Sequence, residues 1–244
     1  WFEEHIRSKA KGQFRNNNAH PIKIHLTSAE IELKEKKEKK ETPSAPPPRF
    51  ILHKNPLLSE MTSENFIFNT SNQILSSLLD LSKKQDWKCE FNPLFFYGSS
   101  CCGKTHLLQA FAHHFQSQNL RVLYIKTETF TENVVQAIRT GNMQDFRKEH
   151  RHTDVLIVDD VQHLAKKSAT QEEFFHTFNT LQSQNKQIVL SADTAPSLLQ
   201  DIEPRLISRF EWGLALPIHK LEKASLLLML KNRCKILSFP LSEP

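Results

Sequence analysis

The stretch Gly98-Ser99-Ser100-Cys101-Cys102-Gly103-Lys104-Thr105 matches the G-x-x-x-x-G-K-[ST] pattern of phosphate-binding loops. In such a loop, backbone N–H groups turn inward and hold phosphate oxygens. The pattern places Gly103 where the backbone approaches the phosphates, Lys104 near the β and γ phosphates, and the Thr105 hydroxyl at Mg²⁺. The predicted nucleotide-binding residues are Gly98, Ser99, Ser100, Cys101, Cys102, Gly103, Lys104, Thr105 and His106.

The flanks of this loop support the same interpretation. An apolar run, Leu94 to Tyr97, precedes it, and a helical pattern from about His106 to Phe115 follows it. The chain has only five glycines, and two of them stand where the pattern requires glycine. A helix that begins at the loop would also direct its positive end at the phosphates. An ordinary turn between a strand and a helix is the alternative, but it would rarely combine all of these features.

Two acidic residues close another apolar run, Val155 to Val158, about fifty residues after the loop. A buried strand that ends in Asp159 and Asp160 would place carboxylates beside the phosphates. We predict that Asp159 holds Mg²⁺, directly or through water, and that Asp160 orients or activates the attacking water. Acidic residues after an apolar strand are common, so this signal gains its weight from its position after the loop.

From residue 51 onward, short apolar runs alternate with amphipathic helical patterns. Runs this continuous are typical of parallel strands that are covered on both faces. We therefore predict an α/β fold with a parallel sheet of about five strands between helices. In the helical stretch Glu172 to Leu181, a stripe of phenylalanines is interpreted as core and not as a ligand contact. The expected strands are Leu94–Tyr97, Val122–Ile125, Val155–Val158, Ile188–Leu190 and Leu214–Leu216.

Composition divides the rest of the chain. Residues 1–32 hold too little apolar area to fold alone. Residues 33–50 combine a charge run with a proline triplet and are predicted to be a flexible linker, with a solvated helix end as the alternative for the charge run. We assign residues 51–217 to the nucleotide-binding core and 218–244 to the start of a helical lid. Because the first residue is Trp1, we expect a fragment or a processed product.

The overall composition says less about partners and location than the motifs say about the site. Of the 244 residues, 39% are hydrophobic, and the net charge is 32 − 27 = +5 with neutral His. A basic balance favours nucleic acid or an acidic surface as a partner without proving either. The four cysteines lack the spacing of a disulfide framework or a zinc site. No apolar run approaches the ~18 residues of a membrane span, so we expect a cytoplasmic protein.

Several of these segments occur in an order that resembles DnaA, the family of bacterial initiators of chromosome replication. The resemblance covers residues 51–235 and implies an AAA+ ATPase core with a truncated lid. It also implies that residues 1–32 end the family's N-terminal interaction domain and that 33–50 are its variable linker. The matching stretches are residues 92–98 and 103–108 around the loop, 171–179 in the following helix, and 205–214 in the family's Box VII.

The resemblance implies roles for three residues around the γ-phosphate. Asp193 matches the sensor 1 position. Arg209 matches the arginine finger that reaches ATP on a neighbouring subunit, and Arg205 matches the Box VII arginine at the same interface. Each has a simpler alternative, because Asp193 could cap the segment before Pro196, and two arginines spaced i, i+4 could form a solvated helix face.

Further residues match the family's ligand contacts. Asn65, Phe66 and Ile67 lie in the segment that lines the nucleotide base. Val135 and Lys167 match positions of the single-stranded DNA surface. The alternatives are that Val135 belongs to the core and that Lys167 is an ordinary surface lysine.

For function, the resemblance implies an ATP-binding initiator that assembles ATP-dependently on the chromosomal origin and promotes DNA strand opening. ATP and Mg²⁺ are the implied cofactors, and slow ATP hydrolysis would reset the switch. The implied partners are origin DNA, further copies of the chain, the replicative helicase and acidic phospholipids. The sensor 2 arginine and the duplex-reading C-terminal domain are expected beyond the end of the chain. The alternatives are a DnaA-related nucleotide-binding regulator without duplex DNA reading and a non-enzymatic interaction fragment.

The chain also departs from the family pattern. Ser99 and Cys101 stand where relatives usually carry glycine, and a side chain at positive φ costs roughly 1 kcal/mol or more. We therefore expect weakened but not abolished nucleotide binding. Ala169 replaces a second basic position of the DNA surface, which weakens that assignment. The loop could also favour a reactive thiolate at Cys101 or Cys102, although ordinary substitution is the simpler interpretation.

Overall fold

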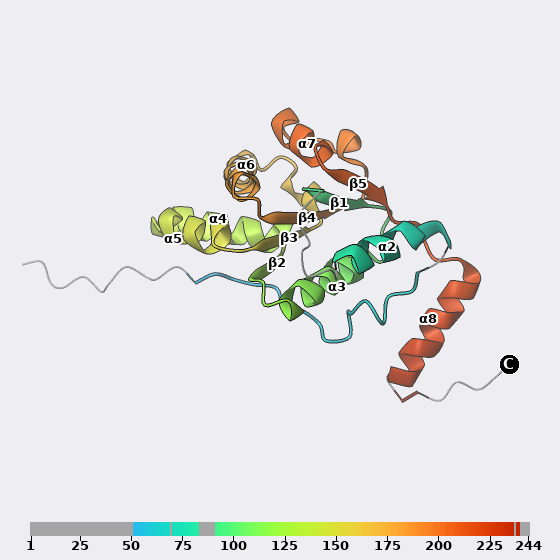
Figure 1. Cartoon of the computed structure of the whole chain (residues 1–244). Helices are drawn as coiled ribbons and strands as arrows, with labels where there is room; N and C mark the ends of the chain where they lie inside the picture. The colour runs from blue at the N-terminus through green and yellow to red at the C-terminus, as the bar shows by residue number, and fades with distance from the viewer. Residues whose placement is uncertain (1–50, 69, 83–90, 237, 240–244) are drawn as a thin grey trace, which may run out of the picture. The chain divides into compact units, whose positions relative to one another are not determined.

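The computed structural model describes residues 51–68, 70–82, 91–236 and 238–239, so the predictions for residues 1–32 and 33–50 lie outside it. Five strands form one parallel sheet in the order β2-β3-β4-β1-β5 (Figure 1). This confirms the predicted fold class. The strands are β1 (Leu94–Tyr97), β2 (Val122–Lys126), β3 (Val155–Asp159), β4 (Gln187–Ala192) and β5 (Leu214–Pro217).

All five predicted strands are present in these pairings. β1 lies between β4 and β5, and its Phe95 pairs with Leu190 of β4. β3 lies between β2 and β4, with Asp159 opposite Lys126 of β2. β4 is longer than the predicted strand, so that Ser191 is a strand residue next to the acidic end of β3.

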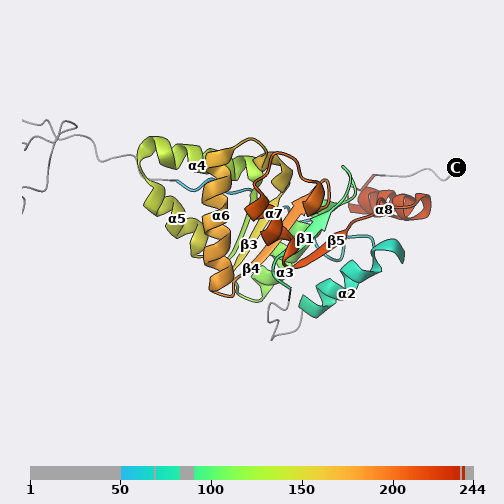
Figure 2. The ribbon, with the colours of Figure 1, turned by 90° about the horizontal axis from the view of Figure 1, so that it is seen from above.

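Helices cover both faces of the sheet (Figures 1 and 2). They are η2 (Thr70–Asn72), α2 (Gln73–Ser82), α3 (Lys104–Ser117), α4 (Thr127–Thr140), α5 (Met143–Arg151), η3 (Val161–Leu164), α6 (Ser168–Ser183), η4 (Pro196–Leu198), α7 (Pro204–Glu211) and α8 (Lys223–Ile236). Successive side chains of a strand point to opposite faces. Phe95 of β1 therefore packs with α4, α5, α6 and α7, whereas Leu94 and Phe96 pack with α2 and α3.

The phenylalanine stripe of α6 belongs to the first of these two layers. Phe174 and Phe178 are fully buried, and their ring centroids lie 6.2 Å and 6.3 Å from that of Phe210 on α7. This confirms that both are core residues. Phe175 lies at the edge of the layer, where it is only partly buried and Arg205 covers its ring.

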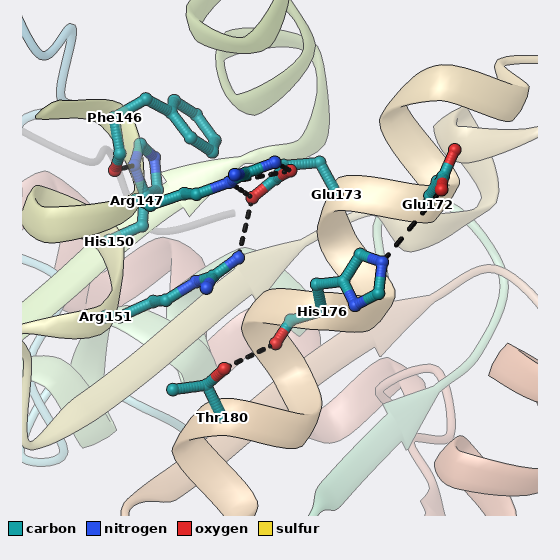
Figure 3. A network of polar contacts seen from close by, with 8 residues as sticks. All are labelled: Phe146, Arg147, His150, Arg151, Glu172, Glu173, His176 and Thr180. Carbon is teal, nitrogen blue, oxygen red and sulfur yellow. Dashed lines mark hydrogen bonds and ion pairs between the residues drawn. The ribbon is translucent and has the colours of Figure 1, made fainter. Parts of the chain in front are cut away.

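An ionic contact joins α5 to α6 (Figure 3). The Glu173 carboxylate, on a residue that is 5% exposed, accepts hydrogen bonds from Arg147 and Arg151, with one nitrogen of each guanidinium at 2.8 Å. His150 lies beside them and stacks on Phe146, with 4.0 Å between the ring centroids. These contacts fix α5 against α6.

A close approach of two backbone segments lies at the start of the C-terminal elements. α7 returns to β5 at Gly213, where a Cβ atom would lie 1.9 Å from the carbonyl oxygen of Pro93, so only glycine fits. α8 begins at Lys223, and its apolar run, residues 226–230, is 41–54% exposed. The run does not form a single helix face, because consecutive helical residues are ~100° apart. Among the described residues, no helix is long and apolar enough to cross a membrane.

Candidate nucleotide-binding site

The loop of residues 98–105 joins β1 to α3, and both of its glycines are required by geometry. The Gly98 N–H donates to the carbonyl oxygen of Ala192 at 3.2 Å, which ties the loop to β4. A Cβ atom on Gly98 would lie 2.4 Å from the carbonyl oxygen of Ile218. Gly103 has φ 103° and precedes the first residue of α3. The loop therefore turns tightly and leads directly into a helix N-terminus.

Lys104 is the first residue of α3 and is 8% exposed. Its Nζ atom donates to the carbonyl oxygens of Gly98 at 2.8 Å and Ser99 at 3.3 Å. These contacts hold the ammonium group against the first two residues of the loop. The first N–H groups of a helix have no partner within the helix, so this end presents both a cation and backbone donors to an anion.

The strain expected in this loop falls on one residue. Cys101 has φ 63° and is exposed, whereas Ser99 is not among the residues with positive φ. Of the two positions where glycine was expected, only the one at Cys101 therefore needs the left-handed conformation. Cys102 is buried, and its Sγ atom fills the space beside Gly98.

The fully buried carboxylate of Asp159, at the end of β3, meets the loop. The Thr105 hydroxyl donates to its Oδ2 atom at 2.7 Å. Hydroxyl and carboxylate oxygens are the ligands that Mg²⁺ prefers, and Mg²⁺ usually takes one or two carboxylates together with phosphate oxygens and water. The donor set of Thr105 and Asp159 therefore fits Mg²⁺ in the presence of a nucleotide.

Two further hydroxyl groups, which lie on the neighbouring strands, contact Asp159, and neither was predicted from the sequence. The Tyr124 hydroxyl donates to Oδ2 at 3.1 Å, and the Ser191 hydroxyl donates to Oδ1. Burial, together with the Asp159 charge, raises the pKa of the Tyr124 phenol, so it keeps its proton at neutral pH. The signal that could have found them is a polar residue inside an otherwise apolar strand.

Asp160 turns away from β3 into the mouth of the site. Its φ is 60°, its N–H donates to the Ser191 hydroxyl at 2.9 Å, and its Oδ1 atom accepts from Gln162 at 3.1 Å. The residue is half-buried and lines a cavity of about 440 Å³ together with Lys104 and Thr105. It is therefore the acidic side chain next to the loop that a water molecule could reach.

A second cavity adjoins this one and has an apolar character. It measures about 490 Å³, and both cavities share Cys101, Gly103 and His106. Volumes of a few hundred Å³ are typical of small-molecule sites. The sequence-predicted residues Asn65, Phe66 and Ile67 line the second cavity, so the structure brings this distant segment to the phosphate loop.

The segment before α2 is held against α3 by His106. The Nε2 atom of His106 lies 2.9 Å from the carbonyl oxygen of Thr62, and its ring meets that of Phe66 edge-on with 5.3 Å between the centroids. Burial lowers the pKa of His106, so a neutral ring is favoured. The residue after Thr105 thus positions the aromatic wall of the apolar cavity.

The three residues expected near the γ-phosphate lie outside both cavities. Asp193 directly follows β4 and is exposed, and the capping position before η4 is Ala195 without a side-chain cap. The alternative role of Asp193 as a cap is therefore not supported. Arg205 and Arg209 lie on α7, where Arg205 pairs with Glu203 and Arg209 donates to Gln182 at 3.4 Å.

The two residues expected at single-stranded DNA lie on neighbouring elements. Val135 of α4 is 38% exposed, so the alternative that it belongs to the core is wrong. Lys167 directly precedes α6 and is half-buried. The contacts between α4 and α6 place both residues in one helical layer of the fold.

Residues 57–217 match the family described as the bacterial DnaA ATPase domain. The chain belongs to the DnaA family. It is 45% identical to chromosomal replication initiator protein DnaA 2 of Protochlamydia amoebophila, over 99% of the chain and 55% of that relative. The chain thus spans about half the length of the curated DnaA proteins that it matches.

Solved DnaA structures share the fold described above. Domain III of the Thermotoga maritima DnaA superimposes with a TM-score of 0.72 at 35% identity and covers 78% of this chain and 79% of that one. A replication initiator DnaA bound to AMPPCP and single-stranded DNA gives a TM-score of 0.70 at 35% identity, over 78% of this chain and 59% of that one.

Proposed function

We propose that the chain is the ATP-binding part of a replication initiator that assembles ATP-dependently on the chromosomal origin and promotes DNA strand opening. One observation carries the proposal. The Thr105 hydroxyl lies 2.7 Å from the Asp159 carboxylate in a DnaA family member, so the phosphate loop and the acidic strand form one site. A DnaA structure with a bound ATP analogue and single-stranded DNA supports it.

In this proposal the backbone N–H groups of residues 98–105 hold the phosphates, and Lys104 pairs with the β and γ phosphates. Mg²⁺, held at Thr105 and Asp159, would neutralise charge on the phosphate oxygens. Asp160 orients the attacking water. The segment of Asn65, Phe66 and Ile67 covers the base in the apolar cavity, whose rings and aliphatic chains suit a flat heterocycle.

Nucleotide-dependent assembly is assigned to residues that line neither cavity. Arg209 and Arg205 on α7 would reach the γ-phosphate bound by another copy, while Asp193 would sense it within the same copy. Both arginines already contact side chains within the single chain. These contacts limit the side-chain conformational entropy that is lost when the arginines bind the phosphate. ATP would then favour a filament or oligomer, and slow hydrolysis would disassemble it.

DNA strands would be held at the layer of α4 and α6, where Val135 offers apolar contact and Lys167 a charge for phosphate. The core of this initiator would comprise residues 51–217, and residues 218–244 would begin the lid over the nucleotide. The replicative helicase and acidic phospholipids are further proposed partners. The net charge of +5 favours contact with an acidic lipid surface.

Equilibrium binding of labelled ATP with Mg²⁺ tests the proposal in the full chain. Lys104→Ala should weaken binding at least ~100-fold, since it removes a desolvated charge contact worth about 3 kcal/mol. Lys148→Ala on α5 is the matched control and should bind as the unchanged chain does, because Lys148 is exposed and lies in neither cavity. If the unchanged chain shows no saturable ATP binding, the nucleotide-binding function is wrong and the interaction-fragment alternative is favoured.

A further inference from the structure

The Asp159 carboxylate is surrounded by hydroxyl donors from three elements. Thr105 of α3 and Tyr124 of β2 donate to Oδ2, and Ser191 of β4 donates to Oδ1. β2 and β4 are the two neighbours of β3, so donors flank the carboxylate on both sides of its own strand. Because each carboxylate oxygen accepts a hydrogen bond, the torsion angle that orients the carboxylate is fixed.

Tyr124 is itself held by a second buried group. Gln109 of α3 donates from its Nε2 atom to the Tyr124 oxygen at 3.4 Å, and Gln109 and Tyr124 are each 3% exposed. The Gln109 Oε1 atom accepts the N–H of Leu58 at 2.8 Å. The side-chain amide is thereby oriented with its donor facing the phenol.

The directions of these hydrogen bonds are determined by the groups that make them. An ionised carboxylate only accepts, so the Tyr124 hydroxyl must donate to Asp159. The phenol oxygen then remains free to accept from the Gln109 amide. The hydrogen bonds therefore run in one direction, from Leu58 through Gln109 and Tyr124 to Asp159.

We propose that Tyr124, oriented by Gln109, is a positioning residue that fixes the Asp159 carboxylate for Mg²⁺, and this proposal rests on the proposed function. The phenol lines neither cavity, so it is not placed to contact a nucleotide directly. It acts through Asp159, in the way that partners of metal ligands orient the ligands and raise metal affinity. The segment that contains Leu58 is thereby linked to the metal site through three side chains.

The test is a Mg²⁺ titration of the binding of a fluorescent, non-hydrolysable ATP analogue to the full chain. Loss of an outer partner of a metal ligand typically costs 10–100-fold in metal affinity. Tyr124→Phe removes only the hydroxyl, and it should raise the Mg²⁺ concentration at half-effect about 10-fold. Nucleotide affinity in EDTA should stay unchanged, because the loop itself is intact. Gln109→Leu leaves the phenol in place and should give a smaller shift in the same direction.

The control is Thr177→Val, which deletes a different fully buried hydroxyl on α6. It should leave the Mg²⁺ midpoint unchanged even if it lowers the melting temperature. Equal weakening of Tyr124→Phe with and without Mg²⁺ would show a merely structural role and would overturn the proposal, as would an unshifted midpoint. If the unchanged chain binds the nucleotide without any Mg²⁺ dependence, the metal site of the proposed function is wrong as well. This outcome is distinct from a failure of the Tyr124 proposal alone, in which the unchanged chain still depends on Mg²⁺.

Discussion

The guanidinium of Arg205 lies over the ring of Phe175, with 4.5 Å between its Cζ atom and the ring centroid. The contact joins α7 to α6 beside the buried rings of Phe174, Phe178 and Phe210. It orients an exposed arginine that the proposed function places at the contact between two copies. The ring covers only the face of the guanidinium, so the nitrogens that do not pair with Glu203 can still donate to a phosphate.

Substitution of Phe175 by leucine should therefore weaken ATP-dependent self-association while ATP binding to the single chain stays unchanged. A cation–π contact at an exposed site contributes about 0.5–1 kcal/mol, so we expect about a 2- to 5-fold weaker association. Arg205→Ala should have the larger effect. Sedimentation with ATP and with ADP would measure both, with the exposed His176→Ala as control. An unaltered association in Arg205→Ala would contradict the assignment.

Cys101 offers a test of strain in the phosphate loop. Its φ of 63° is unfavourable for a side chain, so Cys101→Gly should tighten ATP binding several-fold by relieving about 1 kcal/mol of strain. Cys101→Val should weaken binding, because a β-branched residue at positive φ is more strained still. Comparison of the two by equilibrium ATP binding, with Cys234→Ser as control, checks the order. The reverse order would contradict the assignment of loop strain to Cys101.

His150 predicts a pH dependence of stability. Burial, the largest cause, lowers its pKa to about 4, outweighing the hydrogen bond to the Phe146 carbonyl and the Glu173 charge, and Lys54 and Arg151 lower it slightly further. The folded state thus disfavours protonation that the unfolded chain accepts below pH ~6.5. The contribution to stability is present above that pH and is lost as the pH falls toward 4, by about 3 kcal/mol in total.

Urea unfolding between pH 7 and pH 4 measures this loss. His150→Phe keeps a ring beside Phe146 and Phe130, and the difference in unfolding free energy between the two chains should change across this window. The difference isolates His150 from the other histidines and from the carboxylates. A difference that stays constant with pH would mean that His150 is accessible to protons in the folded state.

Glu173 should contribute far more to the free energy of unfolding than Glu172, its neighbour in sequence. Its buried carboxylate joins Arg147 and Arg151, whereas Glu172 is exposed and lies 4.0 Å from His176 (Figure 3). Glu173→Gln should lower the free energy of unfolding by about 1.5–3 kcal/mol, the range for hydrogen bonds to charged groups. Glu172→Gln should change it by less than ~0.5 kcal/mol. Urea denaturation of both variants at pH 7 would check the contrast, and equal effects would contradict the burial argument.

The sequence by itself determined the five strands, the phosphate loop and the acidic end of β3. These features depend on local patterns, because continuous apolar runs predict buried parallel strands and a loop that binds phosphate needs glycine and lysine at set spacings. Residues 98–105 could be assigned before any contact between distant parts of the chain was known. The same holds for the core role of Phe174 and Phe178, which their helical spacing indicates.

Only the tertiary structure decided which distant residues meet at the site. Tyr124 and Ser191 contact Asp159 because β2 and β4 are the neighbours of β3, and strand order follows from the packing of two helical layers, which no local pattern encodes. The same holds for backbone conformation, since the positive φ falls on Cys101 and not on Ser99. Local spacing identified the ligand-binding residues, and long-range packing supplied the groups that orient them.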